Sequence, residues 1–349
     1  MKALVLTAPR KLNLETVPDP TPQAHQAVVQ VEFAGICGTD VEIYINDLMH
    51  YKRGYAKLPI IPGHEWTGTV VAVGGDVKNV KAGDRVSAEV AIGCGVCRWC
   101  RAGHRNVCPN TREIGIINHD GGFAQFACVP AANLRPTQSM EFRDSALAEP
   151  AAVVVNACRQ GQVTYPDRVL IVGAGPIGLL SLQAARALGA EYVAVMDKNA
   201  ERLALAKQLG ADEILNAKDV SPETLPERCR ALTAGEGFDV VLECAGAGGI
   251  MQALIESLAR RGRFVIVGCY NDQRPAINPD VIINTERMLV GAVGAGNSFD
   301  DAIRLLREGK IKAPPLVTHT YALSEAPQLF ANLAEHKGPQ GALKVLLKP

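Results

Sequence analysis

The chain has 349 residues, of which 48% are hydrophobic and 21% are charged, a composition typical of an ordinary globular protein. Its 36 Lys and Arg residues balance its 36 Asp and Glu residues. The chain therefore lacks the excess of positive charge that would indicate binding to nucleic acid or to an anionic membrane. The apolar N-terminal run is too short for a signal peptide, and no apolar run is long enough to span a bilayer. We therefore expect a cytoplasmic protein, and the length favours two domains.

The first 148 residues carry short apolar or alternating runs, which Gly and Pro residues separate. This pattern is typical of β-strands joined by turns. The runs cover residues 2–6, 27–33, 68–73, 84–90 and 122–129. The N-terminal part of the chain is therefore predicted to be a small, mostly β domain.

Two short motifs in this part carry side chains that could bind a metal. The first is Cys37-Gly-Thr39-Asp40, and the second is Gly63-His64-Glu65. Taken alone, each motif has a more ordinary interpretation, because small cysteines and satisfied histidines are common inside proteins.

Four of the ten cysteines lie close together in a Gly-rich stretch, as Cys94-x2-Cys97-x2-Cys100-x7-Cys108. Four thiolates at this spacing can surround a zinc ion tetrahedrally and leave no position open for a substrate. The spacing therefore indicates a structural zinc site. A thiolate-bound iron–sulfur cluster is the alternative that spacing alone leaves open.

From about residue 149 to residue 290, predicted strands alternate with predicted helices, which indicates a parallel sheet covered by helices on both faces. Helices are expected over residues 200–209, 223–232 and 250–260, and strands over residues 240–242, 264–267 and 288–290. After residue 291, two helices over residues 299–307 and 324–336 and a strand over residues 342–347 form a piece too small to fold alone. We expect one domain of residues 1–149 and 293–349, and another of residues 150–292.

Residues 169–197 combine a buried strand, the sequence Gly173-Ala-Gly175-Pro-Ile-Gly178, a helix, and a second strand that ends at Asp197. The glycines permit a tight turn, a close approach of a pyrophosphate and close packing of helix on strand. The helix N-terminus attracts the phosphates, and a carboxylate at the second strand's tip can bind the ribose hydroxyls and repel a 2′-phosphate. The stretch therefore predicts NAD binding. The expected cofactor-binding residues are Gly173, Gly175, Pro176, Ile177, Gly178, Asp197, Lys198 and Arg202.

These motifs, in this order, resemble the zinc-dependent medium-chain alcohol/polyol dehydrogenases over essentially the whole chain. Ala148-Glu149-Pro150 and the run from Asn156 to Gly161 are similar to the sorbitol dehydrogenase branch, whereas the run from Cys37 to Tyr44 also resembles threonine dehydrogenase. The resemblance implies an α/β fold. It would combine a Rossmann doubly wound parallel sheet with a mostly β, GroES-like catalytic domain that carries a structural zinc lobe.

The resemblance also implies a catalytic zinc site and a homodimer or homotetramer. Its metal ligands would be Cys37 and His64, together with Glu65 and Glu149, which reach the metal directly, intermittently or through its water. Such a zinc ion lowers the pKa of an alcohol so that an alkoxide forms near neutral pH and passes hydride to NAD. Thr39 would take the alcohol proton.

The chain also departs from the pattern of these relatives. Glu42 stands where many of them have a histidine that relays protons to solvent, so Glu42 is either a carboxylate relay or a surface charge. An Arg-Tyr pair that holds the polyol in sorbitol dehydrogenases is replaced by Gly294 and Ala295. Losing these two large polar side chains disfavours sorbitol itself as the substrate.

A basic loop lies between the two ligand motifs and carries Lys52, Arg53 and Lys57. These side chains could hold a substrate carboxylate or phosphate, but a solvated surface loop is the more ordinary interpretation.

We therefore expect a zinc- and NAD-dependent dehydrogenase that oxidises a secondary alcohol of a polyol, sugar or sugar acid to a ketone. The alternatives are an L-threonine 3-dehydrogenase and, from a different class, a non-catalytic NAD-binding protein on the same fold. A zinc-free quinone reductase is excluded because such an enzyme would lack both sets of metal-binding residues.

Overall fold

The structure is a computed structural model that describes residues 1–271 and 273–349. The chain forms two compact units. The first unit comprises Met1–Ala152, Gly294–Arg307 and Lys312–Pro349, and the second comprises Val153–Val293 and Glu308–Ile311. In the part of the chain that the structure describes, no helix is long and apolar enough to cross a membrane.

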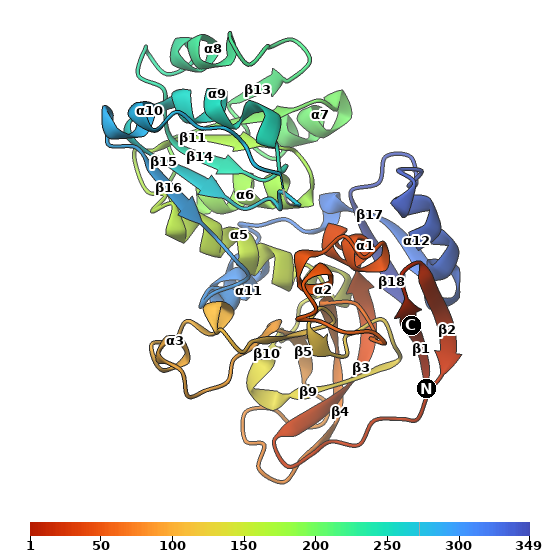
Figure 1. Ribbon diagram of the computed structural model, residues 1–349. Coiled ribbons are helices and arrows are strands. Elements are labelled where there is room, and N and C mark those ends of the chain that lie inside the picture. The colour runs from red at the N-terminus through yellow and green to blue at the C-terminus, as the bar shows by residue number, and fades with distance from the viewer. Residues whose placement is uncertain (272) are drawn as a thin grey trace. The chain divides into compact units, whose positions relative to one another are not determined.

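The first unit is built mainly from β-strands (Figure 1). β1 and β2 form an antiparallel hairpin, and β6, β7 and β8 form a small sheet. The largest sheet has the order β10-β5-β4-β3-β18-β17, with β9 also paired to β3. The strands are β1 (Lys2–Ala8), β2 (Lys11–Thr16), β3 (Gln26–Gly35), β4 (Glu65–Val73), β5 (Arg85–Ala88), β6 (Ala91–Ile92), β7 (Arg112–Ile114), β8 (Asn118–His119), β9 (Phe126–Pro130), β10 (Leu134–Pro136), β17 (Val317–Ala322) and β18 (Lys344–Lys348).

Helices close the first unit around an apolar core. Trp66, Phe123 and Phe330 are fully buried in this core, and the rings of Phe123 and Phe330 meet edge to face at 5.9 Å. The chain passes to the second unit within α5. The helices are α1 (Gly38–Tyr44), α2 (Met49–Lys52), α3 (Arg98–Arg101), α4 (Phe142–Ser145), α5 (Ala148–Gln160), α11 (Phe299–Arg307) and α12 (Ala326–Ala334).

The second unit confirms the predicted doubly wound parallel sheet. Its six strands are parallel, in the order β13-β12-β11-β14-β15-β16, and helices cover both faces (Figure 1). The elements are β11 (Arg168–Val172), α6 (Pro176–Ala187), β12 (Tyr192–Asp197), α7 (Ala200–Gln208), β13 (Glu213–Asn216), α8 (Leu225–Ala231), β14 (Phe238–Glu243), α9 (Met251–Glu256), β15 (Leu258–Ile266), α10 (Pro279–Ile283) and β16 (Met288–Gly291).

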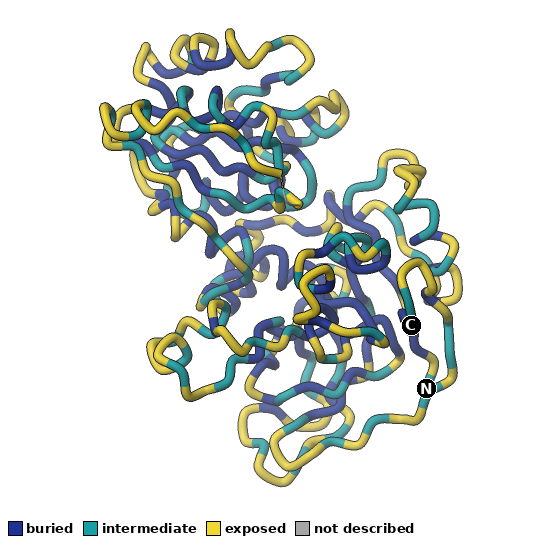
Figure 2. The backbone as a smooth tube through the Cα atoms, in the orientation of Figure 1, coloured by how far each residue is buried: buried dark blue, intermediate teal, exposed yellow. Residues whose placement is uncertain are grey.

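The three central strands of this sheet are buried on both faces and end together (Figure 2). Val172 of β11 pairs with Met196 of β12 on one side and with Glu243 of β14 on the other. The segments after these three strands therefore leave the sheet at the same edge, which is where ligands bind in open α/β sheets.

The helix predicted over residues 250–260 is wrong in its second half. The helix α9 ends at Glu256, and β15 begins at Leu258, which pairs with Phe238 of β14. The Ser257 carbonyl accepts the Phe238 N–H at 2.9 Å. Because this pairing joins residues far apart in the sequence, the local apolar period could not reveal it.

The strand predicted over residues 122–129 is shorter than expected, because β9 begins at Phe126. The preceding N–H groups of Gly122 and Phe123 donate instead to the carbonyls of Gly63 and Pro62, at 2.8 and 3.0 Å. This segment therefore supports the turn that carries His64.

Candidate functional site

Three predicted metal ligands come together in the first unit. Cys37 is the N-cap of α1, and His64 and Glu65 lie where the Gly63 turn enters β4. The sulfur, imidazole and carboxylate ligand atoms of these three residues all lie within 4.8 Å of one another. His64 and Glu65 are buried, whereas Cys37 is only partly so.

Asp40 orients two of these ligands. Its Oδ2 accepts the Cys37 N–H at 2.8 Å, and its Oδ1 lies 3.3 Å from His64 Nδ1. Burial alone lowers the pKa of His64, but Asp40 and Cys37 outweigh burial and raise that pKa well above its ordinary value. The pocket therefore favours positive charge on or beside the imidazole.

The residues present fit a zinc ion. Thiolate, imidazole and carboxylate are the ligand types that zinc prefers, and three protein ligands leave a position for a substrate oxygen. Asp40 Oδ1 and His64 Nδ1 are buried, and neither makes a hydrogen bond within the described residues. A proton on Nδ1 facing Asp40 would leave Nε2 to bind the metal, an arrangement common in zinc sites.

We expect Asp40→Asn to weaken zinc binding at this site by about 10- to 100-fold, because the carboxylate that orients His64 is lost. Competition with a chromogenic chelator measures the affinity, and Asp76→Asn, at an exposed aspartate of the same unit, is the control. Equal affinities in the two variants would contradict this role of Asp40.

Lys344 is a functional residue that the sequence analysis missed. Its Nζ donates to Glu65 Oε2 at 2.6 Å and to the Ile36 carbonyl at 3.1 Å, and the pair is buried. Burial lowers the pKa of Lys344, but the charges of Glu65 and Cys37 more than offset this and raise it. Lys344 begins β18 and another lysine, Lys348, ends it, so the local sequence did not distinguish the buried lysine from the exposed one.

Glu149 lies in the first turn of α5 and is buried. It is not one of the three residues whose ligand atoms cluster within 4.8 Å, although the charges of His64 and Glu65 both act on it. Burial is the main cause that raises the pKa of Glu149 to about 7, and Glu65 adds to it while His64 opposes it. This carboxyl group can therefore change protonation near neutral pH.

Thr39 and Glu42 both lie on α1, three residues apart, so they share one side of this helix. Both are partly buried, and Glu42 Oε2 is a buried atom. Thr39, predicted to take the alcohol proton, and Glu42, predicted to be either a relay or a surface charge, thus lie on the helix that Cys37 caps.

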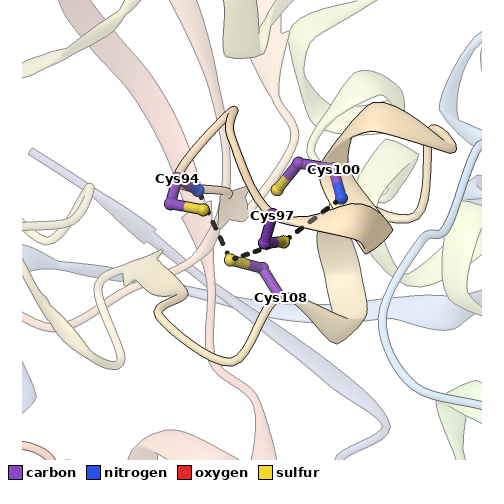
Figure 3. Close-up of side chains that lie close together, drawn as sticks. All are labelled: Cys94, Cys97, Cys100 and Cys108. Carbon is purple, nitrogen blue, oxygen red and sulfur yellow. Dashed lines mark hydrogen bonds between the residues drawn. The ribbon is translucent and has the colours of Figure 1, made fainter.

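The cysteine lobe brings all four predicted thiol ligands together (Figure 3). The sulfurs of Cys97 and Cys108 are 3.8 Å apart, which matches the spacing of about 3.8 Å between thiolates bound at about 2.3 Å to a tetrahedral zinc. The Cys94 N–H points at Cys108 Sγ, and the Cys100 N–H points at Cys97 Sγ, each at 3.4 Å. These donors stabilise thiolate charge.

The pKa values of the lobe cysteines also indicate a metal. Backbone N–H groups lower the pKa of Cys94 to about 6, whereas burial and the neighbouring sulfurs raise the pKa of Cys100 to about 11. Four crowded thiols cannot all ionise without a compensating cation, so a divalent ion fits this set.

A buried carboxylate anchors the lobe to the first unit. Glu89 Oε2 accepts hydrogen bonds from Arg105 in the lobe, at 3.1 Å, and from Arg135 of β10, at 2.8 Å. Arg105 lies between the predicted metal ligands Cys100 and Cys108, so this network fixes the lobe's position.

The glycine loop of the second unit has the geometry that the sequence predicts. Gly173 has φ = 96°, and a Cβ on Gly178 would lie 1.7 Å from the Gly173 carbonyl oxygen. A Cβ on Gly175, the N-cap of α6, would meet no atom within 4 Å. Open space at Gly175, before Pro176 and Ile177, leaves room for a pyrophosphate at the start of the helix.

Asp197 ends β12 beside this loop. Its Oδ2 accepts the Ala174 N–H at 2.6 Å, and its Oδ1 accepts the Asn199 N–H at 2.7 Å. Lys198 is exposed, and the Arg202 N–H in α7 donates to Asn199 Oδ1. An adjacent cavity of about 200 Å³, mostly apolar, was not predicted from the sequence; it is lined by Met196, Lys198, Ala217, Val220, Leu225 and Ile250.

The residues at which the chain departs from its relatives, and those of the basic loop, also lie in the first unit. Ala295 is buried and Gly294 has φ = 59°, and neither residue type has a polar side chain that could hold a polyol. In the basic loop, Lys52 pairs with Asp47 at 2.6 Å, while Arg53 and Lys57 are exposed.

Fold and site together define a zinc-binding, dinucleotide-binding dehydrogenase. Comparison with known proteins identifies the family. Residues 23–139 match the alcohol dehydrogenase GroES-like domain, and residues 176–308 match the zinc-binding dehydrogenase domain. Sorbitol dehydrogenase of Bacillus subtilis is 31% identical over 100% of this chain and 97% of its own. L-threonine 3-dehydrogenase of Saccharopolyspora erythraea is 34% identical over 95% of both chains.

Solved structures agree with this assignment. A protein described as a zinc-binding dehydrogenase of Sinorhizobium meliloti, crystallised with NADP, superposes with a TM-score of 0.92 at 29% identity, over 100% of this chain and 99% of its own. The chain belongs to the zinc-dependent medium-chain alcohol/polyol dehydrogenase family, which confirms the predicted fold class and the predicted enzyme class.

Proposed function

We propose that the protein uses NAD to oxidise a secondary alcohol of a polyol, sugar or sugar acid to a ketone. The cluster of Cys37, His64 and Glu65, in which His64 and Glu65 act by charge on Glu149, carries this proposal. A protein that only bound a dinucleotide would need neither this ligand set nor Asp40 behind it. The similarity to sorbitol dehydrogenases supports the substrate class.

The candidate metal ligands of the first unit form two sets with different roles in this proposal. Cys37 and His64 would hold the catalytic zinc with Glu65 or Glu149, and Cys94, Cys97, Cys100 and Cys108 would hold the structural zinc. When bound, the catalytic zinc supplies a Lewis acid that lowers the pKa of an alcohol.

Proton movement would then depend on side chains of α1. The Thr39 hydroxyl accepts the proton of the substrate alcohol and donates its own toward solvent, and Glu42, on the same side of the helix, receives it. Lys344 holds Glu65 Oε2 at 2.6 Å, which restricts how this carboxylate can turn toward a metal.

NAD, rather than NADP, is the proposed hydride acceptor. Asp197 ends β12 at the edge where the adenosine ribose would bind, and its negative charge repels a 2′-phosphate. The glycine loop from Gly173 to Gly178 would hold the pyrophosphate, with Pro176 and Ile177 opening the helix. Bound NAD supplies the hydride-accepting chemistry.

We expect Asp197→Asn to weaken NADH binding by about tenfold or more, because a charge-assisted hydrogen bond to the ribose is lost. NADPH binding should strengthen, since the repulsion of the 2′-phosphate disappears. Fluorescence titration with both cofactors measures the change, and Glu201→Gln on the exposed face of α7 is the control. An unchanged preference between NADH and NADPH would contradict this role of Asp197.

L-Threonine oxidation is the second candidate. The 34% identity to an L-threonine 3-dehydrogenase and the run from Cys37 to Tyr44 favour it. Glu149 and the residues around it follow the polyol branch instead, so we place this candidate second.

NADH production decides between the candidates. The panel contains polyols, aldonic acids, sugar phosphates and L-threonine, each tested with NAD and with NADP. We expect turnover of a polyol or sugar acid with NAD. Turnover of threonine alone would replace the proposed function with the second candidate.

A further inference from the structure

Glu113 is an acidic residue near the metal-binding cluster to which the sequence analysis gave no role. It is the middle residue of β7, which pairs with β6 on one side and β8 on the other. Its side chain is partly buried. Within residues 1–271 and 273–349, no hydrogen bond or ion pair engages the Glu113 carboxylate, so it is free to bind a ligand.

The segment that follows Glu113 packs directly on the turn that presents His64. A Cβ on Gly115 would lie 2.4 Å from the Gly63 carbonyl oxygen, and a Cβ on Gly121 would lie 2.1 Å from the same atom. Only glycines at both positions permit this backbone contact. β7 is therefore held against the residue that immediately precedes His64.

Hydrogen bonds fix the backbone around Glu113. The Glu113 carbonyl accepts the Ile117 N–H at 2.9 Å, and the Tyr51 hydroxyl donates to the Ile116 carbonyl at 2.8 Å in a buried contact. Since this turn is tied to both β7 and α2, the Glu113 side chain projects from a rigid support.

Electrostatic interactions agree with this placement. Burial raises the pKa of Glu113, and the charge of His64 opposes this effect. Glu113 in turn contributes to the raised pKa of Glu149, together with Glu65. Glu113 and Glu149 thus join Asp40 and Glu65 as carboxyl groups that interact with His64 or lie close to it, and Lys344 forms an ion pair with Glu65.

We propose that Glu113 is a substrate-binding residue that accepts a hydrogen bond from a hydroxyl group next to the alcohol that is oxidised. This inference rests on the proposed function and narrows it to uncharged polyols and sugars. A carboxylate accepts hydrogen bonds from hydroxyl groups strongly, because the bond is charge-assisted. A sugar acid or a sugar phosphate would bring a further negative charge against Glu113 and Glu149, which disfavours both.

The test compares two alcohols that differ only in the neighbouring hydroxyl group, 2-butanol and 2,3-butanediol, with sorbitol and gluconate as a second pair that differs in charge. Steady-state kinetics with NAD give kcat and KM for the wild type, Glu113→Gln and Glu113→Leu. The matched control is Glu141→Gln, at an exposed glutamate of the same unit. Zinc content and melting temperature show that each variant is folded and loaded.

We expect the wild type to prefer 2,3-butanediol to 2-butanol and sorbitol to gluconate. In Glu113→Leu, the KM for 2,3-butanediol should rise about tenfold or more, while kcat/KM for 2-butanol stays within about twofold. Glu113→Gln should show a smaller rise and a weaker discrimination against gluconate. If Glu113 had only a structural role, its replacement would change the kinetic constants for both alcohols alike.

Three results would overturn the inference. They are an unchanged preference for the diol in both Glu113 variants, an equal loss on both butanols, and a wild type that prefers gluconate to sorbitol. Failure of the proposed function looks different, because the wild type would then produce no NADH from any secondary alcohol of the panel.

Discussion

Replacing Lys344 with methionine is expected to lower the free energy of unfolding by about 3–5 kcal/mol. The ammonium group is buried, and its Nζ lies 2.6 Å from Glu65 Oε2. Methionine fills a similar volume but leaves the Glu65 carboxylate buried without its cation, and an uncompensated buried charge is costly. The Ile36 carbonyl also loses its hydrogen bond.

Denaturant unfolding of the zinc-loaded protein measures this loss. Lys344→Arg, which keeps the charge, should recover more than half of it. Lys348→Met is the matched control, because Lys348 lies on the same strand with an exposed side chain and should cost less than about 1 kcal/mol. Equal losses at the two lysines would mean that the ion pair with Glu65 contributes little.

Replacing Cys108 with serine is expected to remove the structural zinc and open the cysteine lobe. The lobe has few apolar side chains of its own, and Val96, Trp99 and Val107 are exposed, so metal binding supplies most of its folding free energy. Zinc content should fall from about two ions to about one ion per chain.

Limited trypsin digestion followed by mass spectrometry shows where the chain opens. Arg98 and Arg101 lie on the short helix α3 inside the lobe, and cleavage at these residues should accelerate more than cleavage elsewhere. Cys128→Ser, at a partly buried cysteine of β9, should change neither zinc content nor cleavage. If both variants keep two zinc ions, the lobe does not hold a metal through Cys108.

Much of the fold follows from local patterns in the sequence. The glycines at 173, 175 and 178 lie within six residues, and the four lobe cysteines lie within fifteen, so spacing alone predicts a dinucleotide-binding loop and a set of thiolate metal ligands. The helix α11 has the predicted bounds, because its apolar face repeats with the period of a helix.

The features that the sequence analysis missed depend on contacts between distant residues. Lys344 is 279 residues from Glu65, and no local pattern links the two. Asp40 lies within a recognised motif, but its contact with His64 depends on how α1 meets β4. Glu113 is brought near the metal-binding cluster by a backbone contact between Gly115 and Gly63, which only the folded chain shows.

Zinc content and NADH production, measured on the wild type and on Cys37→Ser, test the central claim most directly. The account predicts about two zinc ions per wild-type chain and NAD-dependent turnover of a polyol. Cys37→Ser should keep about one zinc ion and lose activity on the order of 10³-fold or more, because the Lewis acid at the substrate is gone. Two results would contradict this claim. They are full activity of Cys37→Ser with two zinc ions bound, and an inactive wild type that holds both zinc ions.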